Sequence, residues 1–219
     1  MKIVHCCLSC FYIDDYGYQE NQLVRQHVIA GHEVVVLAST ENYDQSAQLT
    51  YVEPGEYLGS DGAKVVRLAY APGVPAVVAR KLRIHTGVSD RLQREKPDVV
   101  MFHGLCGWEL LTVTNYCAAN PSVKYYVDSH EDFNNSARTL LSKWLLHGVY
   151  YRGLVHLSLS RIPKVLCVSL ETMDFVENFY RVPKEKLEFY PLGGKVLSDD
   201  EYTARRERCR LKLNVGPEV

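Results

Sequence analysis

Two histidines follow apolar runs at positions where a side chain could do chemistry. His103 ends one such run, and His130 follows the next run among Asp128, Glu131 and Asp132. A histidine beside carboxylates can hold one tautomer or a raised pKa, which suits a proton transfer or a hydrogen bond to a phosphate near neutral pH. The sequence therefore predicts His130 as the catalytic residue and His103 as a residue lining the same cleft. The alternative for His130 is an ordinary polar loop histidine.

A glycine turn near the start of the chain points to anion binding. Gly17 separates an apolar run from a helical stretch that reaches Ala30, and Gly31 precedes a second apolar run. A strand–turn–helix–strand unit puts free backbone N–H groups and the positive helix end at the carboxyl edge of a sheet, where anionic ligands bind. We predict that Gly17 and Tyr18 contact a phosphate or substrate there. The alternative for Gly17 is a purely conformational role.

Three acidic residues flank this turn. Asp14 and Asp15 precede it, and we predict that they contact substrate hydroxyls, with solvated loop residues as the alternative. Glu20 lies in the first turn of the expected helix, where the helix dipole favours a carboxylate. We therefore assign Glu20 to helix stabilisation rather than to acid catalysis.

The elements that must position these residues alternate along the chain. Strand-like runs cover 1–12, 34–37, 64–69, 98–102, 123–127 and 164–168, and helical stretches lie near 75–95, 106–119, 136–158 and 170–180. This alternation predicts an α/β fold with a doubly wound, mostly parallel sheet. Residues 40–62 read as a long polar connection. Ser198 is the expected cap of a short helix that runs through Arg205 and Arg206.

Composition excludes several classes of protein. The 219 residues carry a net charge of -1, which argues against a general nucleic-acid-binding protein. No run reaches the roughly 20 apolar residues that a membrane-spanning helix requires. The apolar start is followed at once by acidic residues, unlike a signal peptide, so we expect a cytoplasmic protein.

The cysteines suggest packing rather than chemistry. There are seven, an odd number, and several stand inside apolar patterns, as reduced buried thiols do. Cys7 and Cys10 match C-x-x-C, but the apolar run continues after them and no second pair has zinc-ligand spacing. We therefore expect neither a metal nor a redox cofactor.

Several motifs, taken in order, resemble the retaining GT-B glycosyltransferases of family 4. They are Gly17-x-x-Glu20 at a helix start, Gly31-His32-x-Val34 before a strand, Pro97-Asp98-Val99-Val100 leading to His103, the strand end Asp128-Ser129-His130-Glu131, Val168-Ser169 before a helix, and Tyr190-Pro191-Leu192-Gly193-Gly194. Two positions depart from the family pattern. Tyr16 replaces the first of the usual paired glycines, and Leu192-Gly193-Gly194 replaces Asn-Gly-Val.

The resemblance implies a Rossmann-like acceptor-side domain over residues 1–192 and an interdomain linker over 193–219. It further implies transfer of a sugar, with retention, from a nucleotide-sugar donor to a glycan or lipid-linked acceptor, with His130 near the sugar or leaving phosphate. The family's donor-binding domain has no counterpart in this sequence. We therefore expect that domain in cis or in trans, and expect the isolated chain to be inactive. The alternative is a non-catalytic binding module or partner subunit that uses the same sheet edge.

A basic and aromatic stretch raises the question of membrane contact. Residues 136–161 place Arg138, Lys143 and Trp144 among leucines, a mixture typical of helices at a membrane face. A protein acting on lipid-linked acceptors would then lie at the inner membrane face. We favour the simpler interpretation of an amphipathic helix with its leucines packed inward, and keep peripheral membrane contact as the alternative.

Overall fold

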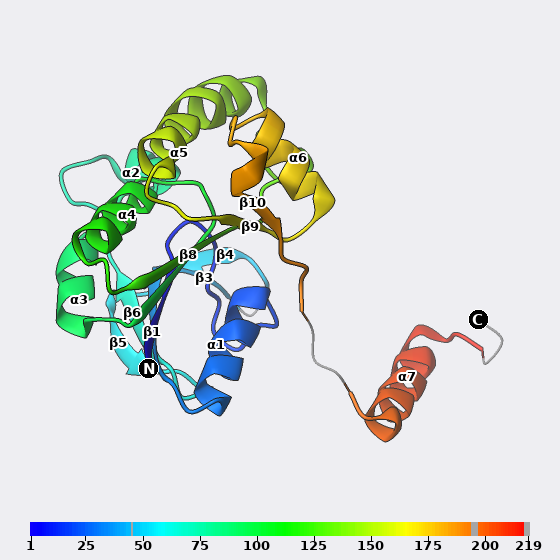
Figure 1. Ribbon diagram of the computed structural model, residues 1–219. Coiled ribbons are helices and arrows are strands. Elements are labelled where there is room, and N and C mark those ends of the chain that lie inside the picture. The colour runs from blue at the N-terminus through cyan, green and yellow to red at the C-terminus, as the bar shows by residue number, and fades with distance from the viewer. Residues whose placement is uncertain (45, 194–196, 217–219) are drawn as a thin grey trace.

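A computed structural model describes residues 1–44, 46–193 and 197–216, and its centre is one sheet (Figure 1). The sheet order is β10-β9-β8-β7-β1-β2-β6-β5. The strands, in that order, are Leu187–Phe189, Val165–Cys167, Lys124–Ser129, Val99–His103, Lys2–Cys7, Glu33–Ser39, Lys64–Leu68 and Gly55–Leu58. All neighbours pair in parallel except β5, which is antiparallel to β6. The predicted α/β fold with a mostly parallel sheet is confirmed.

Helices cover both faces of this sheet. The helical elements are α1 (Gln19–Ile29), α2 (Ala76–Leu82), α3 (Val88–Glu95), α4 (Glu109–Ala119), the π-helical η1 (Ser142–Tyr151), α5 (Arg152–Leu159), α6 (Leu170–Asn178), the short 3₁₀ turn η2 (Lys184–Lys186) and α7 (Asp199–Leu213). Successive strand residues point to opposite faces. Val4 and Cys6 of β1 therefore belong to the core under α3, α4 and α5, whereas Cys7 packs with Val24 of α1 on the other face.

The direction of winding reverses between β1 and β7. The chain builds β2 and β6 on one side of β1, and then crosses to build β7, β8, β9 and β10 on the other side. The carboxyl ends of β1, β7 and β8 therefore lie next to each other at the switch point. In open α/β sheets this is where ligands bind.

The prediction of a long polar connection over residues 40–62 is wrong. The structure has a small hairpin there, β3 (Glu41–Tyr43) with β4 (Leu49–Tyr51), followed by the edge strand β5. Every residue of β5 is exposed. An edge strand without a buried face needs no apolar alternation, so its polar sequence resembled a loop.

Other predicted boundaries shift. The first strand ends at Cys7 rather than Tyr12, the stretch 75–95 divides into α2 and α3, and β10 was not predicted. Ser198 does cap α7, accepting a hydrogen bond from the Glu201 backbone in a capping box, and the helix continues past Arg206 to Leu213. No residue of α7 is buried, and Figure 1 shows α7 apart from the sheet. Within the expected linker over 193–219, residues 194–196 and 217–219 lie outside the described residues.

The cysteines are free thiols throughout the described chain, and all but Cys10 and Cys209 are buried. Among the described helices, none has both the length and the apolar character needed to cross a bilayer.

Candidate functional site

A buried ion pair forms the base of the site at the switch point. The parallel register of β7 and β8 sets His103 opposite Asp128. His103 Nδ1 lies 2.6 Å from Asp128 Oδ2, and both side chains are fully buried. His103 Nε2 lies 2.9 Å from His5 Nδ1 on β1. With both nitrogens engaged beneath the surface, His103 does not line the cleft as predicted, and it acts on the site through Asp128.

A glycine after β7 supplies a second contact to Asp128. The Gly104 backbone N–H donates to Asp128 Oδ1 at 3.0 Å. Gly104 has φ +91, and a Cβ there would stand 3.0 Å from Ser9 Cβ. Glycine is therefore required both for its conformation and for the close approach of the loops after β1 and β7.

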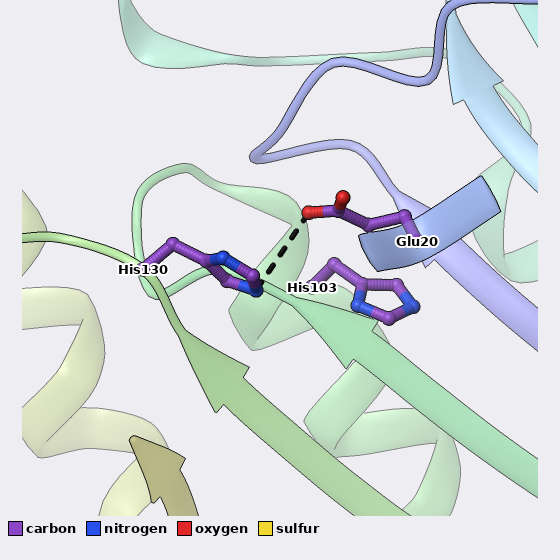
Figure 2. A group of neighbouring side chains, drawn as sticks. All are labelled: Glu20, His103 and His130. Atoms are coloured by element: carbon purple, nitrogen blue, oxygen red, sulfur yellow. Dashed lines mark ion pairs between the residues drawn. The ribbon is translucent and has the colours of Figure 1, made fainter. Parts of the chain in front are cut away.

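His130 lies next to this pair, and its Nε2 has two carboxylates within ion-pair distance but makes no hydrogen bond to the described protein. Its Nε2 lies 3.6 Å from Asp128 Oδ1 and 3.7 Å from Glu20 Oε1. Figure 2 shows His130 and Glu20 pointing toward one another, with Glu20 arriving from the start of α1. His130 Nε2 is buried and has no hydrogen-bond partner in the described protein. A ligand oxygen entering this space would supply that missing partner.

A second buried carboxylate braces the loop that carries His130. Glu131 accepts hydrogen bonds from the Leu105 backbone at 2.9 Å and from the His130 backbone at 3.1 Å. It also accepts the Ser129 hydroxyl hydrogen. These contacts join the ends of β7 and β8, so that His130 rests on a loop held from two strands.

The charges within the site reinforce one another. Burial lowers the pKa of His103, but Asp128 outweighs that effect and raises the pKa to about 10. Burial raises the pKa of Asp128, but His103 brings it well below the usual range. Burial also lowers the pKa of His130, but the carboxylates of Asp128 and Glu20 raise it by more than burial lowers it. The pKa of His130 therefore lies above its ordinary value. The raised pKa values favour positive charge on both rings, and of the two only His130 is placed to meet an incoming anion, because both nitrogens of His103 are engaged.

A metal ion is a second possible occupant. Glu20, His103 and His130 each offer a ligand atom within 4.8 Å of the others. A ligating imidazole needs a free lone pair on one nitrogen. Both nitrogens of His103 are already engaged, at 2.6 Å and 2.9 Å. The three residues therefore do not fit a metal site unless His103 gives up its contact to Asp128 or its contact to His5.

The Gly17 turn is open, but its geometry differs from the prediction. Gly17 is exposed, and a Cβ added there would meet nothing within 4 Å. The left-handed residue of this segment is Asp15, with φ +61, so the backbone does not require glycine at position 17. Tyr18 is the N-cap residue of α1 and lacks a side-chain capping bond. The predicted ligand contacts of Gly17 and Tyr18 remain predictions.

The carboxylates of Asp14 and Asp15 are held by the protein. Tyr57 donates to Asp14 at 2.8 Å, and Arg67 Nη2 lies 3.0 Å from Asp14 Oδ2. Asp15 accepts the Ser60 hydroxyl hydrogen. In this structure the two acidic residues therefore fasten the loop after β1 to the β5–β6 edge, which favours a structural role over the predicted substrate contact.

Two site-forming residues were missed by the sequence analysis. Glu20, assigned to the helix dipole, has its carboxylate at His130. Arg67, fully buried on β6, donates to the backbone oxygens of Tyr12 and Ser39 at 2.7 Å and 3.0 Å. An arginine within the strand-like run 64–69 was the available signal, because a charge inside an apolar strand must find partners.

Comparison with known proteins identifies the family. The family model described as Glycosyltransferase Family 4 matches residues 21–193, most of the chain. The chain belongs to glycosyltransferase family 4. Within this family the chain is the amino-terminal domain, as the resemblance in the sequence implied. No curated protein matches the sequence significantly.

Solved structures agree with the family at the level of the fold. A sucrose-phosphate synthase from Thermosynechococcus elongatus superposes with a TM-score of 0.50 at 12% identity, over 98% of this chain and 100% of that one. A glycosyltransferase from Rickettsia africae gives 0.49 at 12% identity, over 100% of this chain and 50% of that one. The family 4 chain thus spans half the length of the Rickettsia enzyme. At this identity the likeness shows the fold alone, one half of a GT-B architecture.

The expectation of inward-packed leucines in the stretch 136–158 is wrong in part. Leu154 and Val155 are buried, but Leu140, Leu141, Trp144, Leu145 and Val149 are between 59% and 78% exposed. We call these five residues the apolar face. The π-helical turn η1 gives this segment a different residue spacing from the α-helix that the prediction assumed.

Proposed function

We propose that this family 4 domain is the acceptor-side half of a retaining glycosyltransferase that moves a sugar from a nucleotide-sugar donor to a glycan or lipid-linked acceptor. Residues 1–192 would form one wall of the cleft, and residues 193–219 would connect to the donor-binding half. The observation that carries the proposal is the buried Nε2 of His130 at the switch point, which lies next to the carboxylates of Asp128 and Glu20 and makes no hydrogen bond to the described protein. In this proposal the same nitrogen faces the transferred sugar.

In this proposal His130 is the catalytic residue and contacts the sugar or the leaving phosphate. Its raised pKa favours the imidazolium form, which stabilises the negative charge that grows on the phosphate as the sugar leaves. Glu20 and Asp128 hold the ring from two sides. The exposed N–H groups near Gly17 and Tyr18, at the start of α1, would meet the same phosphates.

Aromatic side chains near the α1 start support a sugar acceptor. The ring centroids of Tyr16 and Tyr18 lie 5.1 Å apart, those of Tyr16 and Tyr43 5.6 Å, and those of Phe11 and Tyr43 6.2 Å. Tyr16 and Tyr18 remain 40% and 37% exposed. Partly exposed tyrosines offer a flat apolar surface with a polar edge, which suits the mixed surface of a sugar ring.

The apolar face supports a membrane-bound acceptor. Between residues 133 and 170 the sequence has no acidic residue but contains Arg138, Lys143, Arg152, Arg161 and Lys164. Exposed leucines and a tryptophan beside basic residues match a segment that lies on an anionic membrane surface. This charge balance favours lipid over a second protein as the partner, and with it a lipid-linked acceptor and a location at the inner membrane face.

Turnover tests this function. Residues 1–219 alone should not consume any of a panel of radiolabelled nucleotide sugars, because their fold is one half of a GT-B architecture. Joined to such a half, in cis or in trans, it should transfer the labelled sugar with retention. Turnover by the chain alone would contradict the division of labour, and glycan binding without turnover in the joined protein would support the binding module instead.

A further inference from the structure

A line of imidazoles crosses the domain from the site to α1. His5 is fully buried in the central strand β1, and both of its nitrogens face other histidines. Its Nδ1 lies 2.9 Å from His103 Nε2, and its Nε2 lies 2.9 Å from His27 Nδ1. The rings of His5 and His103 stack with a 5° angle between their planes. With Asp128 at the inner end, the line joins four residues by three hydrogen bonds.

The hydrogen bonds of this line have one consistent direction when His103 is charged. An imidazolium at position 103 donates from Nδ1 to Asp128 and from Nε2 to His5 Nδ1. A neutral His5 then carries its only hydrogen on Nε2 and donates it to His27 Nδ1. His27 is left with its hydrogen on Nε2. His27 is only partly buried, so the outer end of the line is open to solvent.

We propose that His27, His5 and His103 form a proton path between solvent at α1 and the ion pair beneath the site. When His103 is neutral, its one hydrogen lies on Nδ1 and is donated to Asp128, and the other bonds run in the opposite direction: His5 donates from Nδ1 to His103 Nε2, and His27 donates from Nδ1 to His5 Nε2, which leaves His27 Nε2 free. A proton that then binds His27 Nε2 makes that ring an imidazolium, which passes its Nδ1 hydrogen to His5 Nε2. His5 then passes its Nδ1 hydrogen to His103 Nε2. One N–H bond breaks for each that forms, so one positive charge moves from His27 to His103. The reverse sequence returns it.

The surroundings place the charge at the inner end. Burial lowers the pKa values of His5 and His27, whereas Asp128 raises that of His103. Besides its own members Asp128 on β8 and His27 on α1, the line is faced by these titratable and charged groups: Cys7 on β1, Glu20 on α1, His32 after α1, and His130 after β8. Both carboxylates lie at the His103 end.

The use of this path rests on the proposed function. An imidazolium beneath Asp128 makes the site less negative for an incoming phosphate, and a second domain that covers the cleft would cut off solvent from above. A path through β1 and α1 keeps His103 in protonic equilibrium while the cleft is closed. The path itself exists or fails without turnover, so its failure and the failure of the proposed function are distinguishable.

The first test is the tautomer of each ring, read by ¹⁵N NMR of histidine-labelled chain at neutral pH. His103 should carry hydrogen on both nitrogens, and His5 and His27 should each carry it on Nε2 alone. A neutral His103, or a His5 with its hydrogen on Nδ1, would overturn the proposed direction.

The second test separates proton passage from structure. His27→Asn keeps an acceptor oxygen near the position of Nδ1 but has no second nitrogen to take up a proton. The solvent exchange of the His103 Nε2 hydrogen should be lost on the timescale at which the wild type exchanges. His32→Asn is the matched control and should exchange as the wild type does. Unchanged exchange in His27→Asn, with the fold intact by backbone NMR, would overturn the path.

Discussion

At the residue scale, the His103–Asp128 pair is the contact on which the site most depends. Removing one member of a buried ion pair leaves the other charge uncompensated, at a cost of about 3–5 kcal/mol. We expect His103→Asn to lower the free energy of unfolding by about that amount, measured by urea denaturation at pH 6. The double variant His103→Asn/Asp128→Asn should recover most of the loss. A single variant as stable as the wild type would show that the pair does not hold the two strand ends together.

The same pair predicts how stability changes with pH. The pKa of His103 is about 10 in the folded protein, against an ordinary value of 6.5. A raised pKa contributes stability that is fully present below the ordinary value and is lost as pH rises through the folded value. The stability difference between wild type and His103→Asn should therefore shrink from pH 6 to pH 10, in urea midpoints measured at each pH. A difference that grows with pH would contradict the charge assigned to His103.

Replacing glycine by alanine should lower the free energy of unfolding at Gly104 and leave it nearly unchanged at Gly17. Gly104→Ala must place a Cβ at φ +91 and 3.0 Å from Ser9, and the left-handed conformation alone costs about 1–2 kcal/mol. Gly17→Ala meets nothing within 4 Å and should change stability by less than about 0.5 kcal/mol. In the joined enzyme the added Cβ would occupy open space that the proposed function gives to the phosphates, so Gly17→Ala should raise KM for the nucleotide sugar. Wild-type KM in that variant would remove Gly17 from the phosphate contacts.

At the scale of elements, η1 and its neighbours present the apolar face. Trp144→Gln should weaken co-sedimentation of the chain with liposomes that contain anionic phospholipid, because the variant lacks the aromatic ring that would insert into the membrane interface. Ile29→Gln on α1 is the matched control, since Ile29 is 70% exposed and Trp144 is 62% exposed. Wild-type chain that stays in solution at low salt would end the membrane proposal.

The elements were more predictable than the contacts between them. Apolar runs followed by polar residues were enough to place His103 and His130 at strand ends, because parallel strands buried on both faces leave a clear pattern. The pattern did not reveal that His103 points below the surface toward His5, or that Glu20 reaches His130 across 110 residues of chain. Those contacts depend on strand order and helix crossing, which a local sequence does not encode. The exposed strand β5 was missed because it has no apolar face.

At the scale of the whole molecule, the fold is one half of a GT-B architecture. The family model matches residues 21–193, and one half of this architecture implies a second domain that acts with it. In the proposed function this chain supplies the acceptor wall, His130 and the charged groups that hold His130. The partner half supplies the nucleotide contacts.

The catalytic role of His130 is tested most directly by the rate of sugar transfer in the joined protein that carries His130→Asn. Loss of a group that stabilises transition-state charge costs about 10²–10³ in kcat. We expect a fall of that size with KM little changed, while His156→Asn, an exposed histidine on α5, keeps the wild-type rate. A His130→Asn enzyme with wild-type kcat would contradict the central claim that His130 is the catalytic residue of this cleft.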